Sequence, residues 1–156
     1  MEAASLEEFI EHLHPMLVHF PIALLLSAVG LDLSALALKR PGLHRIGLWN
    51  LSLGTLGAGL AVLTGLQAEA IAKHSFDIWK VMGLHKRLGI TTLILSLMVS
   101  AYRLRKRDEL TKAQRRAVTA AMLILAGTIS IGAMLGGRLV YEFGVGGPST
   151  ESETSP

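Results

Sequence analysis

The sequence has 156 residues and no cysteine. The absence of cysteine excludes disulfide bonds, thiolate metal sites, iron–sulfur clusters, thioether-linked haem and a cysteine nucleophile. Charge is also scarce, since only 17% of the residues are charged, whereas an average soluble domain has about 25%. A surface that faces water needs charge, so the composition disfavours a soluble domain as well as a disordered chain.

Aromatic residues are few, at 5%, although 51% of the sequence is hydrophobic. The apolar content is therefore mostly Leu, Ala, Ile, Val and Gly, which is typical of closely packed membrane helices. Four apolar runs reach the length of about 20 residues that a helix needs to cross a bilayer, and no run alternates like a strand. We expect an all-α integral membrane protein, an up-down four-helix bundle over residues 16–145, with spans Met16–Leu38, Ile46–Ala72, Leu84–Leu104 and Ala117–Tyr141.

The basic residues indicate how this bundle is oriented. Ten of the fifteen lie between the first and second spans or between the third and fourth, and short basic loops mark the cytoplasmic side. Both termini then face outward, in a multi-pass protein of the bacterial inner (cytoplasmic) membrane. The net charge of +3 reflects topology, so a nucleic-acid partner is disfavoured. The ten residues are Lys39, Arg40, Arg45, Arg103, Arg105, Lys106, Arg107, Lys112, Arg115 and Arg116.

The two ends of the chain differ from the spans. Residues 1–15 have a capping-box pattern at Ser5 and Glu8 and an apolar helical face, which predicts a short interfacial helix that Pro15 ends. Residues 146–156 contain mainly Gly, Pro, Ser, Thr and Glu, and we expect them to be a disordered tail.

Five of the six histidines lie on the predicted outer side, and only His44, which we expect at the lipid headgroups, lies on the inner side. His19 and His85 each open a span at a similar depth, so their imidazoles are candidate axial ligands of a b-type haem, with His14 as a further candidate. Arg138 and Arg87 are candidate partners of the haem propionates.

Other chemistries fit the same outer cluster. His19 and His85 are also candidate ligands of a metal ion, helped by His14 and Glu69, and a His–Glu pair can handle protons or quinols. The alternative without a ligand is that these histidines form hydrogen bonds only with loops and lipid headgroups. Near the inner side, Asp32 is expected to pair with Arg45 or Arg103.

The segment HPMLVHFPIALLL at His14–Leu26 resembles the start of an uncharacterised bacterial family of four-span membrane proteins, domain of unknown function 2231. LHKRLG at Leu84–Gly89 and GGRLVYEFGVG at Gly136–Gly146 extend the resemblance over roughly residues 12–147. The matching positions are His14, His19, Pro21, His85, Gly136, Gly137, Tyr141 and Gly144. Many relatives have a histidine where this chain has Phe143. The resemblance implies the four-span fold and an association with bacterial respiratory proteins.

Together these observations predict a membrane protein that binds haem b near its outer face and acts in respiratory electron transfer. A periplasmic cytochrome or another respiratory redox protein is the expected partner, besides the bilayer and a second copy of the chain. The competing prediction is a cofactor-free structural or scaffold subunit. A stand-alone enzyme is disfavoured, because the sequence shows neither a nucleophile with its base nor a phosphate-binding loop.

Overall fold

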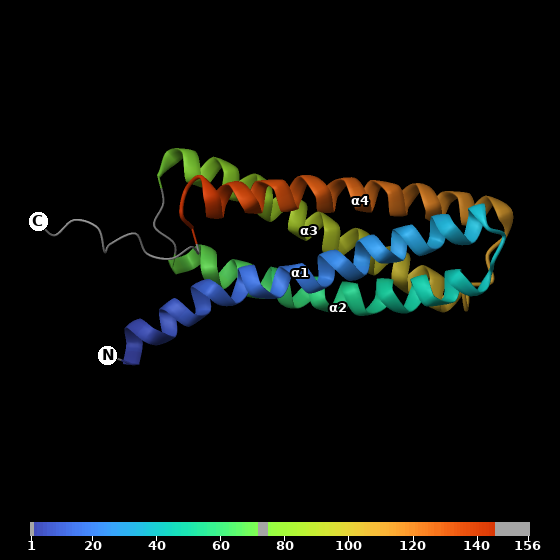
Figure 1. Ribbon diagram of the computed structural model, residues 1–156, viewed down its shortest axis with the longest axis horizontal. Coiled ribbons are helices and arrows are strands. Elements are labelled where there is room, and N and C mark those ends of the chain that lie inside the picture. Colours follow the sequence, from blue (N-terminus) through green and yellow to red (C-terminus); the bar gives the residue numbers. More distant parts are fainter. Residues whose placement is uncertain (1, 72–74, 146–156) are drawn as a thin grey trace, which may run out of the picture.

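The computed structural model describes residues 2–71 and 75–145, with side chains described from residue 13 onward except at residue 71. Its elements are four helices, α1 (Glu2–Ala37), α2 (Gly42–Ile71), α3 (Phe76–Arg105) and α4 (Lys112–Tyr141). They run up and down in one bundle, so that the start of α1 and the end of α4 lie at the same end (Figure 1). The predicted all-α bundle is confirmed.

Helix α1 differs from the expectation at its start. It is continuous from Glu2 to Ala37 and contains both Pro15 and Pro21, so the prediction that Pro15 ends a separate helix is wrong. Membrane helices tolerate proline because neighbouring groups satisfy the freed backbone carbonyl. The first turns of α1 extend beyond the bundle in Figure 1. The expected disordered tail at 146–156 lies outside the described residues.

All four helices are long and apolar enough to cross a membrane. The spans are Leu13–Ala37, Gly42–Ala70, Phe76–Arg105 and Lys112–Tyr141, of 25 to 30 residues each. At 1.5 Å per residue they exceed the ~30 Å of a hydrocarbon core by a turn or more. The ends of the helices therefore reach the headgroup region, where charged side chains meet water and lipid phosphates.

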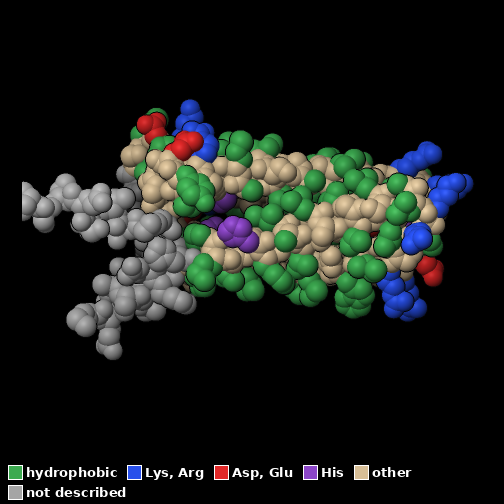
Figure 2. Space-filling model, viewed as in Figure 1, with side chains coloured by type: hydrophobic (Ala, Val, Ile, Leu, Met, Phe, Trp, Pro, Cys, Tyr) green, Lys and Arg blue, Asp and Glu red, His purple; other side chains and the backbone are tan. Residues whose placement is uncertain are grey.

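The outer surface of the bundle is apolar in the middle. On α2, Leu56, Leu60 and Leu63 are 58–70% exposed, and Figure 2 shows hydrophobic side chains along the body of the bundle and charged ones toward its two ends. A soluble protein rarely exposes apolar patches on this scale. The surface is that of a multi-pass membrane protein, as the sequence predicts.

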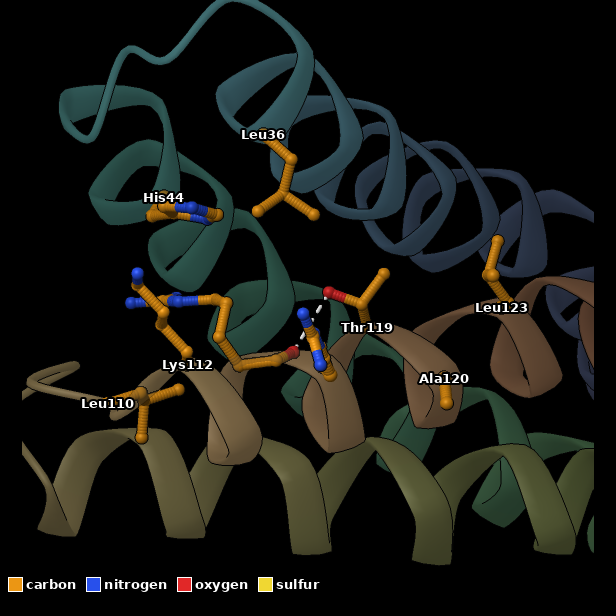
Figure 3. A pocket seen from close by; sticks show the side chains of 9 residues that line it. Leu36, His44, Leu110, Lys112, Thr119, Ala120 and Leu123 are labelled. Carbon is orange, nitrogen blue, oxygen red and sulfur yellow. Dashed lines mark hydrogen bonds between the residues drawn. The ribbon is translucent and has the colours of Figure 1, made fainter.

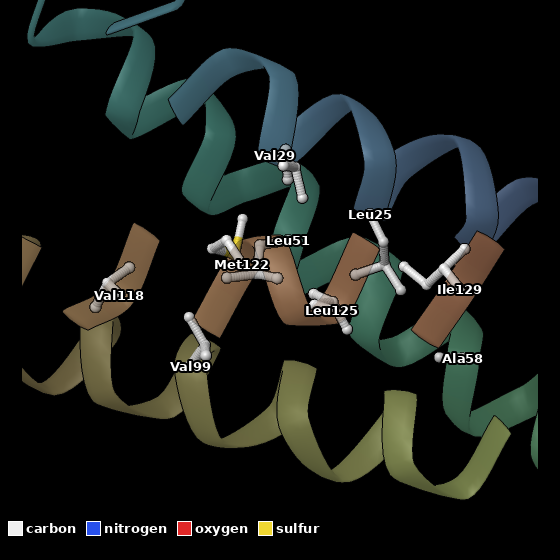
Figure 4. Close-up of a cluster of buried hydrophobic side chains, with 10 residues drawn as sticks. Leu25, Val29, Leu51, Ala58, Val99, Val118, Met122, Leu125 and Ile129 are labelled. Atoms are coloured by element: carbon white, nitrogen blue, oxygen red, sulfur yellow. The ribbon is translucent and has the colours of Figure 1, made fainter. Parts of the chain in front are cut away.

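Helix α1 packs mainly on α2, and α3 mainly on α4, whereas α1 and α4 meet over a small area. Helices α1 and α3 are thus diagonal across the bundle axis. Leu25, Leu51, Met122 and Leu125 form the centre of the buried core (Figure 4). Close approach of α1 and α2 needs glycine, since a Cβ at Gly54 would lie only 2.8 Å from the Leu25 side chain.

Candidate functional site

Two histidine rings meet across the bundle axis, toward the end that carries the termini. His14 comes from α1 and His85 from α3, the diagonal helices, and their ring centroids are 6.2 Å apart with an interplanar angle of 82°. Figure 2 shows histidine atoms between the upper and lower helices toward this end. We call His14 and His85 the histidine pair.

Each ring of the histidine pair is oriented by the neighbouring helix. The Thr64 hydroxyl lies 3.1 Å from the carbonyl oxygens of Leu60 and Ala61, to which it donates. Its oxygen therefore accepts a hydrogen bond from Nδ1 of His14, at 3.2 Å. His85 Nδ1 donates to the carbonyl of Gly132 at 2.9 Å. In a neutral imidazole the second nitrogen then carries the lone pair, so Nε2 of both rings is a potential ligand.

Both rings also lie directly on glycine. A Cβ at Gly65 of α2 would come within 2.9 Å of His14 Cε1, and a Cβ at Gly136 of α4 within 3.0 Å of His85 Cε1. Real Cβ atoms do not tolerate such contacts with a fixed ring, so each glycine provides the space that its histidine occupies. The two helical pairs, α1 with α2 and α3 with α4, thus present one imidazole each in the same way.

The partner of His85 is His14 and not His19, contrary to the predicted pairing. His19 is exposed on α1. The phase of the helix explains this difference, because His14 is 18 residues from the buried Asp32, which is five full turns at 3.6 residues per turn. His19 is 13 residues from Asp32, about 3.6 turns, and falls on another face. The inward-facing Asp32 was the signal in the sequence that places His14, and not His19, on the inner face of α1.

The predicted cations Arg87 and Arg138 lie at the same end as the histidine pair, together with Lys86. Lys86 donates to both carboxylate oxygens of Glu69, at 2.6 and 2.8 Å. Arg138 pairs with Glu142 at 2.9 Å, and both of these side chains are exposed. Arg87 is exposed. Glu69 is therefore engaged with a lysine, and the structure does not bring it to the histidine pair as a ligand.

A different polar cluster lies at the opposite end. Arg103, with no exposed surface, donates to Asp32 at 2.6 Å, to the His44 carbonyl at 2.7 Å and to Asp108 at 2.9 Å. Arg115 of α4 also donates to the Asp108 carboxylate, at 3.1 Å. We call these residues the arginine cluster. The expected pairing of Asp32 is confirmed with Arg103.

His44 belongs to the arginine cluster, so the expectation that it lies at the lipid headgroups is wrong. It is 8% exposed, and its Nδ1 donates to Asp32 Oδ1 at 2.8 Å. A buried carboxylate must be surrounded by donors. His44, in the first turn of α2, is therefore buried beside Asp32. Asp108 adopts a left-handed φ of 57°, which Asp tolerates better than most residues. Its carboxylate can thereby turn back to Arg103.

The donor set at the histidine pair limits what it can hold. Among the described residues there is no group of three or more His, Cys, Asp or Glu side chains suited to a metal ion. Zinc sites use three or four protein ligands, which the described residues at this end do not offer. Two imidazoles, with no third protein ligand among the described residues, fit a metal ion that is held in a cofactor and takes its other ligands from that cofactor.

The comparisons with known proteins give a family and no activity. The model of a family described as "Predicted membrane protein (DUF2231)" matches residues 11–148, so the chain belongs to this family. The match includes the whole histidine pair and the whole arginine cluster. No curated protein and no solved structure matches the chain.

Proposed function

We propose that this DUF2231 protein binds a b-type haem between His14 and His85 and carries electrons at the outer face of the membrane. The observation that supports the proposal is the histidine pair itself. Its rings come from diagonal helices and lie 6.2 Å apart at a nearly perpendicular angle, and each keeps Nε2 available because Nδ1 is held by the adjacent helix.

The separation of the rings suits two axial ligands of one iron. Metal–imidazole bonds of roughly 2.0 Å set the two nitrogens about 4 Å apart and the ring centres roughly 6 Å apart. The observed centroid distance is 6.2 Å. Haem supplies four ligands of its own, so two imidazoles complete the iron, in agreement with the absence of a third protein ligand among the described residues.

The helix packing offers a route for a flat ring. The small contact between α1 and α4 makes this side the easiest to widen. Gly89 has open space where a Cβ would point. Arg87 and Arg138 are exposed at the same end and are the residues we assign to the propionates, with Arg138 exchanging its partner Glu142.

Haem would supply one-electron chemistry, and the protein would hold the imidazoles in register and exclude water from them. A site near the outer face favours a soluble redox partner, such as a periplasmic cytochrome, over a partner inside the cell. Polar groups at membrane depth that face the bundle interior are commonly functional, which supports the same conclusion.

The test is the reduced-minus-oxidised absorption spectrum of the purified protein, expressed with haem supplementation. The wild-type protein should show the α-band of a bis-imidazole haem. His14→Ala and His85→Ala should each abolish it, whereas His19→Ala should retain it. His19 is the matched control because it is a histidine of the same helix that faces outward. Loss of the band in His19→Ala with retention in His14→Ala would restore the pairing of His19 with His85.

The second candidate function is a cofactor-free structural subunit. It is favoured by one observation, since T-shaped aromatic contacts have centroid distances of 4.5–7 Å and the histidine pair falls within this range. If the wild-type protein shows no band after haem supplementation, while His14→Ala lowers only the thermal stability, the structural function replaces the haem proposal.

A further inference from the structure

A pocket of about 590 Å³ lies at the end of the arginine cluster, between α1, α2 and α4 (Figure 3). Its inner wall is His44, and its basic wall is the first turns of α4. The pocket is far from the histidine pair and uses none of its residues, so it is independent of the haem proposal. The lining residues that matter are Leu36, His44, Lys112, Arg115, Arg116 and Leu123.

The charge of the pocket has one sign. Three cations line it and no acidic side chain does. Arg115 is held by Asp108, whereas Lys112 and Arg116 form no ion pair within the part of the chain that the structure describes. Two neighbouring cations on one turn repel each other, so the pocket favours an anion.

His44 adds an accessible polar atom to the same pocket. Its side chain is 10% exposed, and its Nδ1 donates to Asp32. No described residue forms a hydrogen bond with its Nε2. Every buried side-chain nitrogen and oxygen of the described residues has a partner, so the unpartnered Nε2 is an accessible atom of the pocket wall. An unprotonated nitrogen accepts hydrogen bonds, so the inner wall suits a hydroxyl group that lies beside the anion.

The opposite wall of the pocket is apolar and faces the lipid. Leu36 of α1 is 45% exposed and Leu123 of α4 is 51% exposed, and Figure 3 places Leu36 on the helix opposite Lys112 and Leu123 farther along α4, away from Lys112. Thus one edge of the pocket is basic, at the level of the helix ends, and the other continues along the membrane-facing surface. A free anion would use only the first edge, whereas a lipid would use both.

We propose that this pocket binds an anionic phospholipid with a hydroxylated headgroup, of the phosphatidylglycerol type. Lys112 and Arg116 bind its phosphate, a headgroup hydroxyl donates to His44 Nε2, and an acyl chain runs along Leu36 and Leu123. Basic pockets between membrane helices are suited to anionic headgroups. The lipid would join α1, α2 and α4 on the side where α1 and α4 have little direct contact.

Lipid retention tests the proposal by native mass spectrometry of detergent-purified protein, with phosphatidylglycerol and phosphatidylcholine added in equal amounts. The wild-type protein should retain phosphatidylglycerol preferentially. The double variant Lys112→Gln/Arg116→Gln should bind it roughly 25-fold more weakly, because each basic residue near an anionic lipid surface contributes about fivefold (~1 kcal/mol). The matched control is Arg105→Gln/Lys106→Gln, which removes two exposed cations at the same end that do not line the pocket. It should bind like the wild-type protein.

Two further results decide against the proposal. Equal loss in both double variants would mean that diffuse charge, and not the pocket, holds the lipid. Displacement of the lipid by an equal concentration of glycerol phosphate would mean that the pocket binds a free anion. Circular dichroism and the elution volume of each variant report folding, and Lys112→Gln alone, with an expected loss of about fivefold, is the second variant if the double variant is misfolded.

Discussion

Arg103 uses every nitrogen of its guanidinium group in hydrogen bonds to protein oxygens, whereas within the described residues His14 and His85 each use only Nδ1. The histidine pair and the arginine cluster are both polar, both include residues of α1 and α3, and both lie inside a membrane bundle. They differ in how many of their polar atoms have a hydrogen-bond partner. Each donor of Arg103 has one, whereas the histidine pair keeps two potential ligand atoms, the Nε2 nitrogens. A saturated side chain such as that of Arg103 can only hold helices together, whereas an imidazole with a free nitrogen can also bind a ligand.

The separation between the two clusters is the same on both diagonal helices. His14 and Asp32 are 18 residues apart on α1, and His85 and Arg103 are 18 residues apart on α3. This separation is about 27 Å along a helix, close to the ~30 Å of a hydrocarbon core. The apolar core of Leu25, Leu51 and Leu125 fills the space between them. Each cluster thus lies near one boundary of the membrane.

The largest expected effect concerns which of these two boundaries faces the outside of the cell, because a cysteine at a given position is either labelled or not labelled by an impermeant reagent. The sequence contains no cysteine, so single cysteines can be introduced without background. In intact spheroplasts, an impermeant thiol reagent should label Tyr141→Cys, whose position is 91% exposed, and should leave Glu109→Cys unlabelled until the membrane is opened. Labelling of Glu109→Cys alone would reverse the assignment of the two ends.

The saturated cluster should dominate stability. Arg103→Met leaves the carboxylates of Asp32 and Asp108 without their main donor, and removal of one partner of a buried ion pair costs about 3–5 kcal/mol. Reversible unfolding in mixed micelles measures this change. The control is Arg105→Met, two residues further along α3 at an exposed position, which should stay within about 0.5 kcal/mol of wild type. A similar cost for both variants would contradict the special role of the arginine cluster.

How much of this arrangement could be predicted from the sequence depends on the range of the interaction. The spans follow from local apolar runs, and the pairing of Asp32 with either Arg45 or Arg103 follows from the cost of a buried charge. The packing of the helices decides for Arg103. The burial of His44 does not follow, because it depends on how the first turn of α2 meets α1. The supports of the histidine pair, Thr64 and Gly65, are equally hidden, since small residues are common in membrane helices and only the packing shows which of them faces a ring.

The glycine beneath each ring gives the next largest effect. Gly136→Ala places a Cβ at 3.0 Å from His85 Cε1, and overpacking of this kind costs about 1–3 kcal/mol. The adjacent Gly137 has nothing within 4 Å of the same added atom, so Gly137→Ala should be neutral or stabilise the helix by up to about 1 kcal/mol. Thermal unfolding of the two variants in one detergent gives the comparison. Equal effects at both positions would mean that α4 does not press on His85.

The smallest effect is expected from the hydrogen bond that orients His14. Thr64→Val keeps the shape of the side chain but removes the oxygen that accepts from Nδ1, and the loss of one such bond costs about 1 kcal/mol. The matched control is Thr91→Val at an exposed position on α3, where the hydroxyl supports no ring and the change should be within about 0.5 kcal/mol. Chemical-shift measurements on 15N-labelled histidine check the mechanism separately, because the Nδ1–H form of His14 should lose population in Thr64→Val and remain in Thr91→Val. An unchanged tautomer in Thr64→Val would show that Thr64 does not set the free nitrogen, and the contrast between the saturated and unsaturated ends would then rest on His85 alone.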